Sequence, residues 1–427
     1  METNQLYNYF LECSSIATDT RKIEPGSLFV ALKGDNFDAN TFAQEALAKG
    51  AKYVVIDNAA YKTGDKMLLV NNSLEALQQL AQYHRRQLGL PIIALTGSNG
   101  KTTTKELINV VLAKKYNTKA TVGNLNNHIG VPLTLLSFTT ATEIGIVEMG
   151  ANHQKEIEFL CTIAEPNFGY ITNFGKAHLE GFGGFEGVIK GKSELYTYLE
   201  QNTKMAFVNL DDETQNQKTK DLPRFTFATD SYDGDVRIDD VTANPMVKLY
   251  YNDQTIQSHL IGIYNATNIS AAIAIGNYFK VEDSSIKEAI EAYIPANNRS
   301  QLLEKNGNKI ILDAYNANPS SIAAAVANFA QLDATGKVAI LGDMFELGPE
   351  SPEEHAKVVG LLVPETDIET YFIGNDFYSN RVEQPHLFFY KTFDDFKNYL
   401  ADVKFINKNI LIKGSRGMAL ERTLDLL

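Results

Sequence analysis

Residues 91–105 read PIIALTGSNGKTTTK, and this stretch decides the fold of the chain. An apolar run of strand character ends in a loop with two glycines, and Lys101 then opens a segment with a helical pattern. Such a loop presents backbone N–H groups and the positive end of a helix, which together hold phosphate. The ammonium group of Lys101 would reach the outer phosphates of a nucleotide, and the hydroxyl of Thr102 would bind Mg²⁺.

The loop departs from the strict phosphate-loop motif, which has glycine six residues before the lysine, because Leu95 stands there. An ordinary glycine-rich turn between a strand and a helix is the alternative interpretation. The strand before the loop, the helix after it and the Lys-Thr pair at the junction favour binding of ATP or GTP. The predicted nucleotide-binding residues of the loop are Gly97, Ser98, Asn99, Gly100, Lys101, Thr102 and Thr103.

Length and composition exclude several classes of protein. A chain of 427 residues with 44% hydrophobic residues has material for two or three packed domains. The net charge of −13, without a basic block, argues against nucleic acid as a partner. No apolar run is long enough to span a bilayer and the N-terminus has no leader pattern. Two cysteines, Cys13 and Cys161, fit a reducing compartment as inert packing residues, so we expect a cytoplasmic protein.

Apolar runs alternate with helical patterns along the chain, which is typical of α/β domains. We expect three of them. Residues 1–88 would form a small mixed α/β domain, and residues 89–297 a central phosphate-loop domain with a doubly wound, mostly parallel sheet. Residues 298–427 would form a Rossmann-like α/β domain, although they lack G-x-G-x-x-G after their first strand, so dinucleotide binding is not supported.

Some segments have less regular patterns. We expect a strand over residues 27–32 and a helix over residues 41–49, capped by Asn40. Residues 213–252 show short strands and turns, which predict an antiparallel addition to the central sheet. Asn268 precedes an alanine-rich helix expected over residues 269–278, where it would cap the helix or face a nucleotide base.

Polar residues gather where the central strands are expected to end, which is where ligands bind in parallel α/β sheets. Glu148 follows the apolar run 144–147, and its carboxylate would hold Mg²⁺ there. His178 lies just past the expected strand 169–172. A lone histidine in a loop is more often a plain hydrogen-bonding residue, but this location favours a metal ligand. The asparagine-rich segment 124–132 is either an active-site loop or a capped turn.

Other polar groups have a plain interpretation beside the functional one. Lys192 would by default be a solvated lysine. In two loops near the N-terminus, Arg21 and Lys33 are candidate cations for an anionic ligand and Asp19 is a candidate acceptor. The alternative is that these loops are turns with solvated charges.

Together these motifs resemble the Mur ligases, cytoplasmic ATP-dependent amide ligases of peptidoglycan synthesis. The resemblance covers nearly the whole chain and is carried by residues 96–103, 124–132, 148–150 and 172–180 and by Lys192. Within the family the chain is most similar to the ligases that add D-alanyl-D-alanine to UDP-N-acetylmuramoyl-tripeptide. The specific cues are TDTRK (18–22), LFVALKG (28–34), DAYNANP (313–319), LGDMFELG (341–348) and KGSR (413–416). The Asp-Asn-x-Arg signature of the ligases that add the third residue is absent.

The resemblance implies a role for each matching residue. The first domain would bind the UDP part of the substrate, and we expect the third domain to close over the second by rigid-body rotation around residue 298. Lys101, Glu148, His178 and Lys192 would be the catalytic set. Thr102 and Glu148 would hold one Mg²⁺, and His178 a second one that is placed with the help of a carbamylated Lys192. The remaining implied contacts are Asn268, Arg299 and Asp313 with ATP, Asp19, Thr20, Arg21, Lys33, Gly34 and Asn127 with the UDP-muramoyl substrate, and Asn316 and Asn318 with D-Ala-D-Ala.

Two departures from the family pattern concern the first domain. Asn40 stands where relatives often have histidine, and the N-terminal segment is short.

The implied reaction joins a carboxylate and an amine at the expense of ATP, through an acyl phosphate, in a monomeric enzyme. Another ligase of the family is the first alternative, adding an amino acid to a UDP-muramoyl peptide or glutamate to a folate. A nucleotide-binding switch that hydrolyses ATP to change partners is the second, from a different class. That second alternative leaves His178, Lys192 and the third domain without a role.

Overall fold

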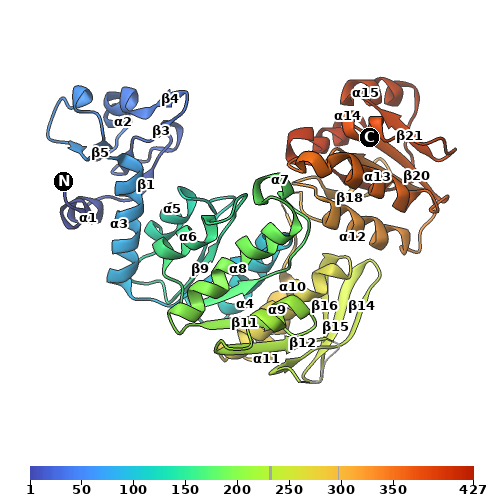
Figure 1. Ribbon diagram of the computed structural model, residues 1–427, viewed down its shortest axis with the longest axis horizontal. Coiled ribbons are helices and arrows are strands. Elements are labelled where there is room, and N and C mark those ends of the chain that lie inside the picture. Colours follow the sequence, from blue (N-terminus) through green and yellow to red (C-terminus); the bar gives the residue numbers. More distant parts are fainter. Residues whose placement is uncertain (230–232, 297) are drawn as a thin grey trace.

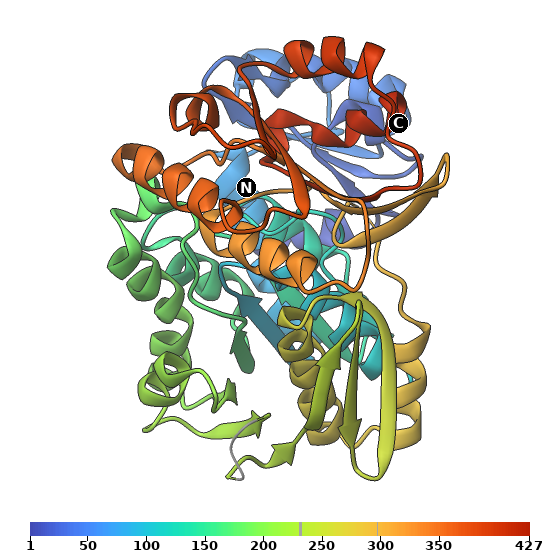
Figure 2. The same ribbon diagram turned by 90° about the vertical axis from the view of Figure 1, so that its right-hand side faces the viewer.

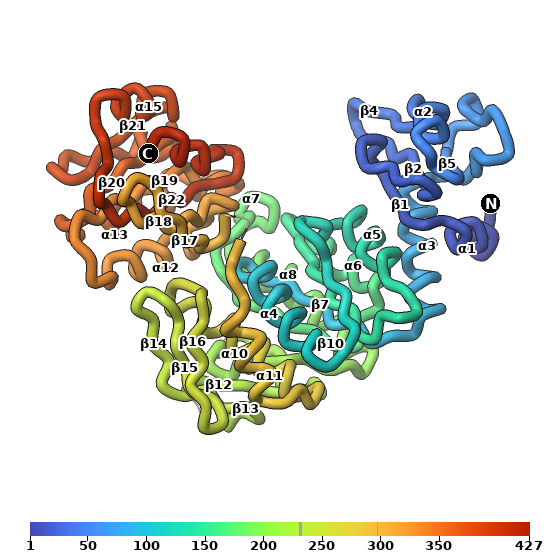
Figure 3. The backbone as a smooth tube through the Cα atoms, turned by 180° about the vertical axis from the view of Figure 1, so that it is seen from behind, coloured from blue at the N-terminus to red at the C-terminus, as the bar shows by residue number. Residues whose placement is uncertain are grey.

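The structure is a computed structural model that describes residues 1–229, 233–296 and 298–427. The chain forms three α/β units in succession, each around its own sheet. Figure 1 shows the N-terminal and C-terminal units at opposite ends of the central unit, and the view from behind in Figure 3 shows the same order. The expected class, three α/β domains with a parallel central sheet, is confirmed. The domain limits stay predictions, and residue 297, at one of them, lies outside the described residues.

The N-terminal unit has a four-stranded parallel sheet. Its strands are, in spatial order, β1 (Ile16–Ala17), β2 (Leu28–Val30), β5 (Tyr53–Ile56) and β6 (Met67–Leu69), and its helices are α1 (Thr3–Leu11), α2 (Ala43–Ala48) and α3 (Ser73–Leu88). A small hairpin of β3 (Lys33–Gly34) and β4 (Phe37–Asp38) projects from it. Asn72 caps α3 by accepting from the N–H groups of Leu74 and Glu75, and α3 leads directly toward the central sheet.

Two local predictions for this unit are wrong. The strand expected over residues 27–32 is limited to Leu28–Val30. The helix expected over residues 41–49 begins as a 3₁₀ turn over Ala39–Phe42 that is capped by Asp38, and α2 follows it. Asn40 is fully buried, and its side-chain amide donates to Asp38 and Asp57, so it joins two loops instead of capping a helix.

The central unit is built on a seven-stranded sheet in which all strands are parallel. In spatial order the strands are β13 (Val236–Arg237), β12 (Arg224–Ala228), β11 (Met205–Asn209), β10 (Phe168–Ile171), β7 (Ile92–Thr96), β9 (Ile144–Glu148) and β8 (Thr118–Ala120). The helices are α4 (Lys101–Leu112), α5 (Gly130–Leu136), α6 (Glu156–Ala164), α7 (Leu179–Phe182), α8 (Phe185–Gln201), α9 (Glu213–Lys218), α10 (Tyr264–Tyr278) and α11 (Asp283–Ala292).

Helices cover both faces of this sheet because successive strand residues point to opposite sides. Ile93 and Leu95 of β7 belong to the core that α4, α10 and α11 complete. Ile92 and Ala94 belong to the other core, to which α5, α6 and α8 contribute. The doubly wound arrangement therefore places the carboxyl ends of β7, β9 and β10 at one common edge.

The segment expected to be antiparallel is only partly so. β12 and β13 extend the parallel sheet, and the antiparallel part is a separate sheet of β14 (Asp239–Ala243), β15 (Met246–Tyr251) and β16 (Gln254–Ile261). Residues 230–232 of the predicted segment lie outside the described residues. In the turned view of Figure 2 the small yellow sheet lies below the C-terminal unit.

The C-terminal unit has a six-stranded mixed sheet with the order β17 (Gln301–Lys305), β18 (Asn308–Asp313), β22 (Asn409–Lys413), β19 (Lys337–Gly342), β20 (Ile368–Ile373) and β21 (Leu387–Tyr390). Its strands are parallel except β17, which pairs antiparallel with β18. The helices are α12 (Pro319–Ala330), α13 (Ser351–Leu362), α14 (Asn375–Ser379) and α15 (Phe393–Asp402).

Two further observations concern the whole chain. Within the described ranges, helices that combine the length and the apolar character needed to cross a membrane are absent. Cys13 and Cys161 are free thiols, and burial raises the pKa of Cys13 to about 11, as expected for packing residues rather than reactive ones.

Candidate active site

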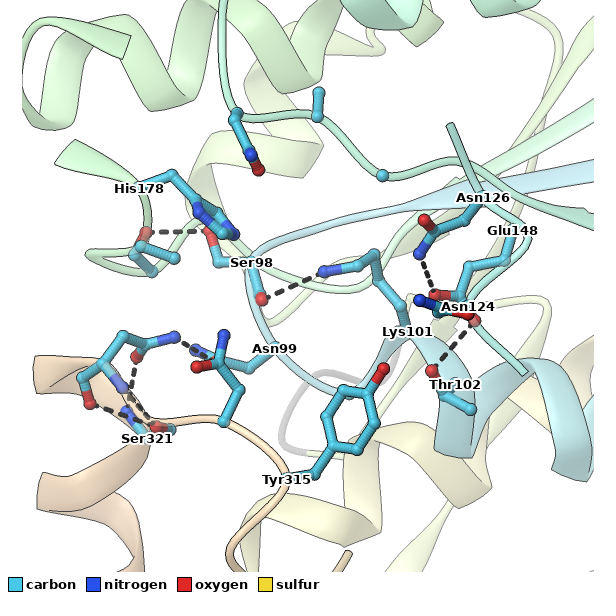
Figure 4. Close-up of a pocket in the computed structure, with 18 of the residues that line it drawn as sticks. Ser98, Asn99, Lys101, Thr102, Asn124, Asn126, Glu148, His178, Tyr315 and Ser321 are labelled. Carbon is cyan, nitrogen blue, oxygen red and sulfur yellow. Dashed lines mark hydrogen bonds between the residues drawn. The ribbon is translucent and has the colours of Figure 1, made fainter. Parts of the chain in front are cut away.

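A cavity of about 1440 Å³ lies where the three units meet. Residues from the start of α3, from the carboxyl edge of the central sheet and from the loops after β18 and β22 line it. Figure 4 shows the part around the phosphate loop, with Lys101 between His178 on one side and the Thr102–Glu148 pair on the other. The carboxyl ends of the central strands therefore open onto this cavity, as expected for a parallel sheet.

The phosphate loop joins β7 to α4 and has the tight backbone that its glycines allow. Gly97 and Gly100 have φ values of 144° and 78°, in the region that favours glycine. A Cβ atom on Gly97 would lie 1.9 Å from Oγ1 of Thr172, and one on Gly100 would lie 2.6 Å from Oδ1 of Asn268. Both glycines are needed because neighbouring side chains fill the space beside them.

Lys101 folds back onto its own loop. Its Nζ atom donates to the carbonyl oxygens of Gly97 at 2.8 Å and Ser98 at 3.2 Å. Desolvation lowers the pKa of Lys101, and the nearby Glu148 carboxylate opposes that shift. Ser98, Asn99, Thr102 and Thr103 also line the cavity.

Glu148 and Thr102 form a buried oxygen pair at the ends of β9 and the loop. Oγ1 of Thr102 donates to Oε2 of Glu148 at 2.9 Å, and Nδ2 of Asn126 donates to Oε1 at 2.8 Å. Glu148 is only 2% exposed. The sequence predicted Glu148 and Thr102 but not Asn126, which the Asn-rich motif contains without showing which amide points inward.

Asn127 has a different local role from Asn126. Its Oδ1 atom accepts from the N–H groups of Ile129 and Gly130, so it holds the turn that starts α5. Asn127 also lines the cavity. The capped turn is therefore present and forms part of the cavity wall, and the role of segment 124–132 as an active-site loop stays a prediction.

His178 stands on the opposite side of the phosphate loop, just before α7. Its φ of 54° is in the left-handed region, and its Nδ1 atom contacts Oε2 of Glu346 from the C-terminal unit. The histidine lines the cavity. In residues 1–229, 233–296 and 298–427, three or more His, Cys, Asp or Glu side chains do not gather around one metal position. A metal here would therefore need ligands beyond these side chains.

Lys192 is not a solvated lysine. It lies on α8, is 1% exposed, and donates from Nζ to the carbonyl oxygen of Ala151 at 3.1 Å. The Phe182 ring centroid is 4.9 Å from Nζ. Burial, with a smaller contribution from the charge of Lys101, lowers the pKa of Lys192 well below its usual 10.5. Lys192 does not itself line the cavity, but its hydrogen-bond partner Ala151 does.

The C-terminal unit contributes a group of cations around one aromatic ring. The Arg299 guanidinium carbon lies 3.7 Å from the centroid of the Tyr315 ring, and that of Arg416 lies 4.9 Å from it. Asp313 accepts from Nζ of Lys413 at 2.6 Å. Arg299 and Asp313 were predicted to contact ATP. Tyr315, Lys413 and Arg416 lie in the motifs quoted from the sequence, but no role was predicted for them.

The three predicted asparagines make specific contacts. Asn268 lies inside α10, which begins at Tyr264, so it does not cap that helix. It accepts from Thr104 at 3.0 Å and lines the cavity. The backbone carbonyl of Asn316 accepts from Lys413 at 3.4 Å. Asn318 caps α12, and its Nδ2 atom donates to Oδ1 of Asn99 in the phosphate loop at 2.7 Å.

The predicted substrate residues of the N-terminal unit lie elsewhere. Arg21 pairs with Asp19 at 2.7 Å and Lys33 pairs with Asp57 at 2.8 Å, and none of Asp19, Thr20, Arg21, Lys33 and Gly34 lines the cavity. The N-terminal unit instead lines the cavity with residues of α3 and its cap, namely Asn72, Leu74, Glu75 and Gln78. The sequence pattern of an ordinary amphipathic helix gave no signal for these residues.

Comparison with known proteins gives the same three-part division of the chain. It matches three family models in succession, namely the Mur ligase family catalytic domain over residues 12–85, the Mur ligase middle domain over residues 95–276 and the Mur ligase glutamate ligase domain over residues 298–416. The UDP-N-acetylmuramoyl-tripeptide–D-alanyl-D-alanine ligase of Bacillus subtilis is 33% identical over 419 residues, which are 95% of this chain and 91% of that one.

Two solved structures are similar over nearly their full length. MurF from Acinetobacter baumannii is 31% identical with a TM-score of 0.86, and the match covers 99% of this chain and 98% of that one. The MurF ligase from Thermotoga maritima in complex with ADP is 26% identical with a TM-score of 0.84, covering 98% and 97%. The succession of domains and the full-length likeness show that this chain belongs to the Mur ligase family, as a MurF-like member.

Proposed function

We propose that this chain is an ATP-dependent ligase that joins D-alanyl-D-alanine to UDP-N-acetylmuramoyl-tripeptide, giving the UDP-linked pentapeptide, ADP and phosphate. The observation that carries the proposal is the shared cavity, in which a phosphate loop, a buried Glu148–Thr102 pair and groups from all three units meet. A cavity of about 1440 Å³ has room for large substrates beside a nucleotide. The names of the similar ligases supply the substrates.

Each unit would have a separate task. Residues 1–88 would bind the UDP-muramoyl substrate, residues 89–297 the phosphates of ATP, and residues 298–427 the rest of ATP and the incoming D-Ala-D-Ala. Because Asp19, Arg21 and Lys33 are engaged away from the cavity, the start of α3 is the part of the first unit that supports substrate contact in this arrangement. We propose a monomer that works in the cytoplasm, where ATP is made.

The residues present fit Mg²⁺ at the end of β9. Mg²⁺ prefers oxygen ligands and keeps several waters, and Thr102 and Glu148 offer two oxygens beside the expected phosphates. His178 would serve a second ion through the ring nitrogen that does not contact Glu346. Mg²⁺ bound at these positions would neutralise charge on the phosphate oxygens.

Lys192 fits the carbamylation that the family resemblance implies. Burial lowers the pKa of Lys192, which raises the share of free amine, and only the free amine attacks CO₂. The product is a carbamate, which replaces a buried cation by an anion with two oxygens. Such an anion near Lys101 and the phosphate loop would be stabilised by the cations of the site.

The chain's own groups would then promote two displacements. In the first, a carboxylate oxygen of the tripeptide forms a bond to the γ-phosphorus of ATP while the bond from that phosphorus to ADP breaks. Lys101 would leave the carbonyl groups of Gly97 and Ser98 and neutralise the transferring phosphoryl group. Positioning and charge neutralisation carry this step, since no covalent bond to the protein is needed.

In the second displacement the amine of D-Ala-D-Ala attacks the carbonyl carbon of the acyl phosphate. The new C–N bond forms, phosphate leaves with the C–O electron pair, and the amine gives up a proton. The acyl phosphate must be kept from water, and the C-terminal unit would exclude it by rotating toward the other two units around residue 298. Asn298 and Ser300 have φ values of 57° and 47°, in the left-handed region, and the hydroxyl groups of Ser300 and Tyr264 are hydrogen-bonded at 3.0 Å.

Phosphate release by the purified protein tests this proposal. ATP and Mg²⁺ are supplied with UDP-MurNAc-tripeptide and D-Ala-D-Ala, singly and together. Release that requires both, with one ADP for each pentapeptide, is expected. Release with ATP alone would favour a nucleotide switch, and release with glutamate and a folate would favour another ligase of the family.

A further inference from the structure

The loop that carries His178 contacts the C-terminal unit at two points, one through the imidazole ring and one through the backbone. Glu346 lies in the loop after β19, and its carboxylate contacts Nδ1 of His178. The backbone carbonyl of the same Glu346 accepts from the N–H group of Glu180 at 3.2 Å. Glu346 of the C-terminal unit thus contacts both the side chain of His178 and the backbone of Glu180.

Both partners of this contact have unusual backbone conformations. His178 and Glu346 have φ values of 54° and 62°, in the left-handed region that non-glycine residues rarely adopt. Such conformations persist only where the surroundings hold them, and they cluster at functional sites. Two such conformations therefore meet at the boundary between two units.

Buried groups hold the Glu346 loop in place. The N–H group of Met344 donates to Nε2 of His355 at 3.0 Å, and that of Phe345 donates to Oγ of Ser415 at 3.0 Å. His355 is fully buried, and Asp343, 4% exposed, accepts from the N–H groups that open α14. The carboxylate of Glu346 is therefore presented to His178 by a rigid support, although Glu346 itself is half exposed.

The contact determines which ring nitrogen of His178 is free. Because Nδ1 faces a carboxylate, Nδ1 carries the hydrogen and Nε2 keeps its lone pair in the neutral ring. In the described part of the chain, Nε2 has no hydrogen-bond partner, and His178 lines the cavity. A carboxylate on the distal nitrogen is the usual means by which proteins orient a metal-binding histidine.

We propose that Glu346 is a positioning residue that orients His178 toward the second metal ion. Because Glu346 belongs to the C-terminal unit, this ligand is fully oriented only when that unit is docked against the central one. The inference rests on the proposed function for the identity of the ion. An ion pair that served only to join the surfaces of the two units would contribute little, so loss of Glu346 would then leave metal binding unchanged, whereas a positioning role predicts weaker metal binding.

Binding of Mn²⁺, followed by electron paramagnetic resonance in the presence of a non-hydrolysable ATP analogue, tests the inference. We expect two ions per chain in the unaltered protein, and Glu346→Ala should weaken the weaker site about 10- to 100-fold without changing the other. His178→Asn should weaken the same site. Glu346→Gln keeps an acceptor for Nδ1–H and should restore most of the affinity. Glu383→Gln, at an exposed position of the same unit, is the matched control and should leave both sites unchanged.

The ¹⁵N resonances of the His178 ring provide a readout of orientation that does not depend on metal or substrates. The Nδ1–H tautomer is expected in the unaltered protein and in Glu346→Gln, and a mixture of tautomers in Glu346→Ala. Equal Mn²⁺ binding by Glu346→Ala and the unaltered protein, or an unchanged second site in His178→Asn, would overturn the inference while leaving the ligase assignment intact. Loss of the second site in Glu346→Ala supports the inference even if the substrates prove different.

Discussion

Lys192 and Glu148 are both buried. Burial lowers the pKa of the lysine amine, and buried hydrogen bonds fix the orientation of the glutamate carboxylate. The lowered pKa of Lys192 favours the free amine in a place where a carbamate would have the Lys101 cation nearby. Glu148 has both carboxylate oxygens engaged, by Thr102 and by Asn126, so its orientation toward the cavity is fixed before any ligand binds. Fixed orientation is what makes a single carboxylate an effective ligand.

Carbamylation of Lys192 predicts a dependence on dissolved CO₂. Stripping CO₂ and bicarbonate should lower the rate, and adding bicarbonate should restore it. As pH falls through the lowered pKa of Lys192 the amine becomes protonated and stops reacting, so the carbamate and the activity should fall together. Lys192→Ala should reduce kcat by about 100-fold or more, the scale of losing one group that stabilises charge, with partial recovery by acetate.

Lys190→Ala is the matched control for that experiment, because Lys190 lies on the same helix but is exposed. Its rate should equal that of the unaltered protein. A Lys192→Ala variant with full activity in CO₂-free buffer would contradict the carbamate.

Glu148→Gln tests the first metal position. The amide keeps the size of the side chain and removes the charge, so kcat should fall by roughly 100- to 1,000-fold and more Mg²⁺ should be needed for half-maximal rate. Initial rates over a range of Mg²⁺ concentrations measure both effects. Glu200→Gln, an exposed change on α8, should behave like the unaltered protein. An unchanged Mg²⁺ requirement in Glu148→Gln would remove Glu148 from the metal site.

Residues at strand ends could be predicted from the sequence, and their partners could not. Lys101, Thr102 and Glu148 follow apolar strands directly, so the parallel sheet alone brings them together. Asn126 comes from a long loop, and Tyr315 and Glu346 come from the other unit, so their contacts depend on tertiary packing that no local pattern encodes. Asp19 and Arg21 were also predicted from a local pattern, as contacts of an anionic ligand, but in the structure they form an ion pair with each other.

At the scale of elements, α12 is a helix whose cap residue, Asn318, also contacts another unit. Asn318 caps it with the reciprocal Ser321 contact, and the same side chain donates to Asn99 of the phosphate loop. The cap and the link use different atoms, since Oδ1 serves the helix and Nδ2 serves the loop. Substitution can therefore separate the two effects.

Asn318→Ala should lower the free energy of unfolding by about 1 kcal/mol, the usual cost of losing a cap. Asn318→Ser keeps an oxygen for the cap but has no donor that reaches Asn99, so it should regain stability without regaining the link. Urea unfolding measures the first effect, and the KM for ATP should rise in both variants. Equal stability of the Ala variant and the unaltered protein would show that the cap contributes nothing.

Elements with long apolar runs were predicted well, and short or irregular ones were not. The apolar run 144–147 lies within β9, and the strand expected over residues 169–172 is β10, shifted by one residue, because both patterns are continuous. The edge strand β17 is only half buried and was missed. α10 begins five residues early because polar residues in its first turns are buried against the phosphate loop rather than exposed.

At the scale of the molecule, polar contacts join the C-terminal unit to the central one, beside buried apolar residues of both units that belong to one hydrophobic cluster. Asn318 bonds to Asn99, Lys176 pairs with the buried Glu354 at 2.6 Å, and Glu346 contacts His178. The three-domain architecture follows from the alternation of strands and helices in the sequence. How the units touch does not, because each of these contacts involves single polar residues, such as Glu354 on α13, that no local pattern pairs with a partner.

Domains of one chain commonly change their relative orientation when ligands bind between them, so closure should respond to ligands. Small-angle scattering should show a smaller radius of gyration with an ATP analogue and the tripeptide together than with neither. Glu354→Ala removes the buried partner of Lys176 and should reduce the compaction. Identical scattering curves with and without ligands would contradict closure around residue 298.

Transfer of ¹⁸O from the substrate carboxylate tests the central claim most directly. UDP-MurNAc-tripeptide labelled in its terminal carboxylate is incubated with ATP, Mg²⁺, D-Ala-D-Ala and the protein, and the products are analysed by mass spectrometry. We expect pentapeptide in which one labelled oxygen remains, and one labelled oxygen in each released phosphate. Unlabelled phosphate, or label in AMP, would contradict an acyl phosphate and with it the assignment of this cavity as a ligase site.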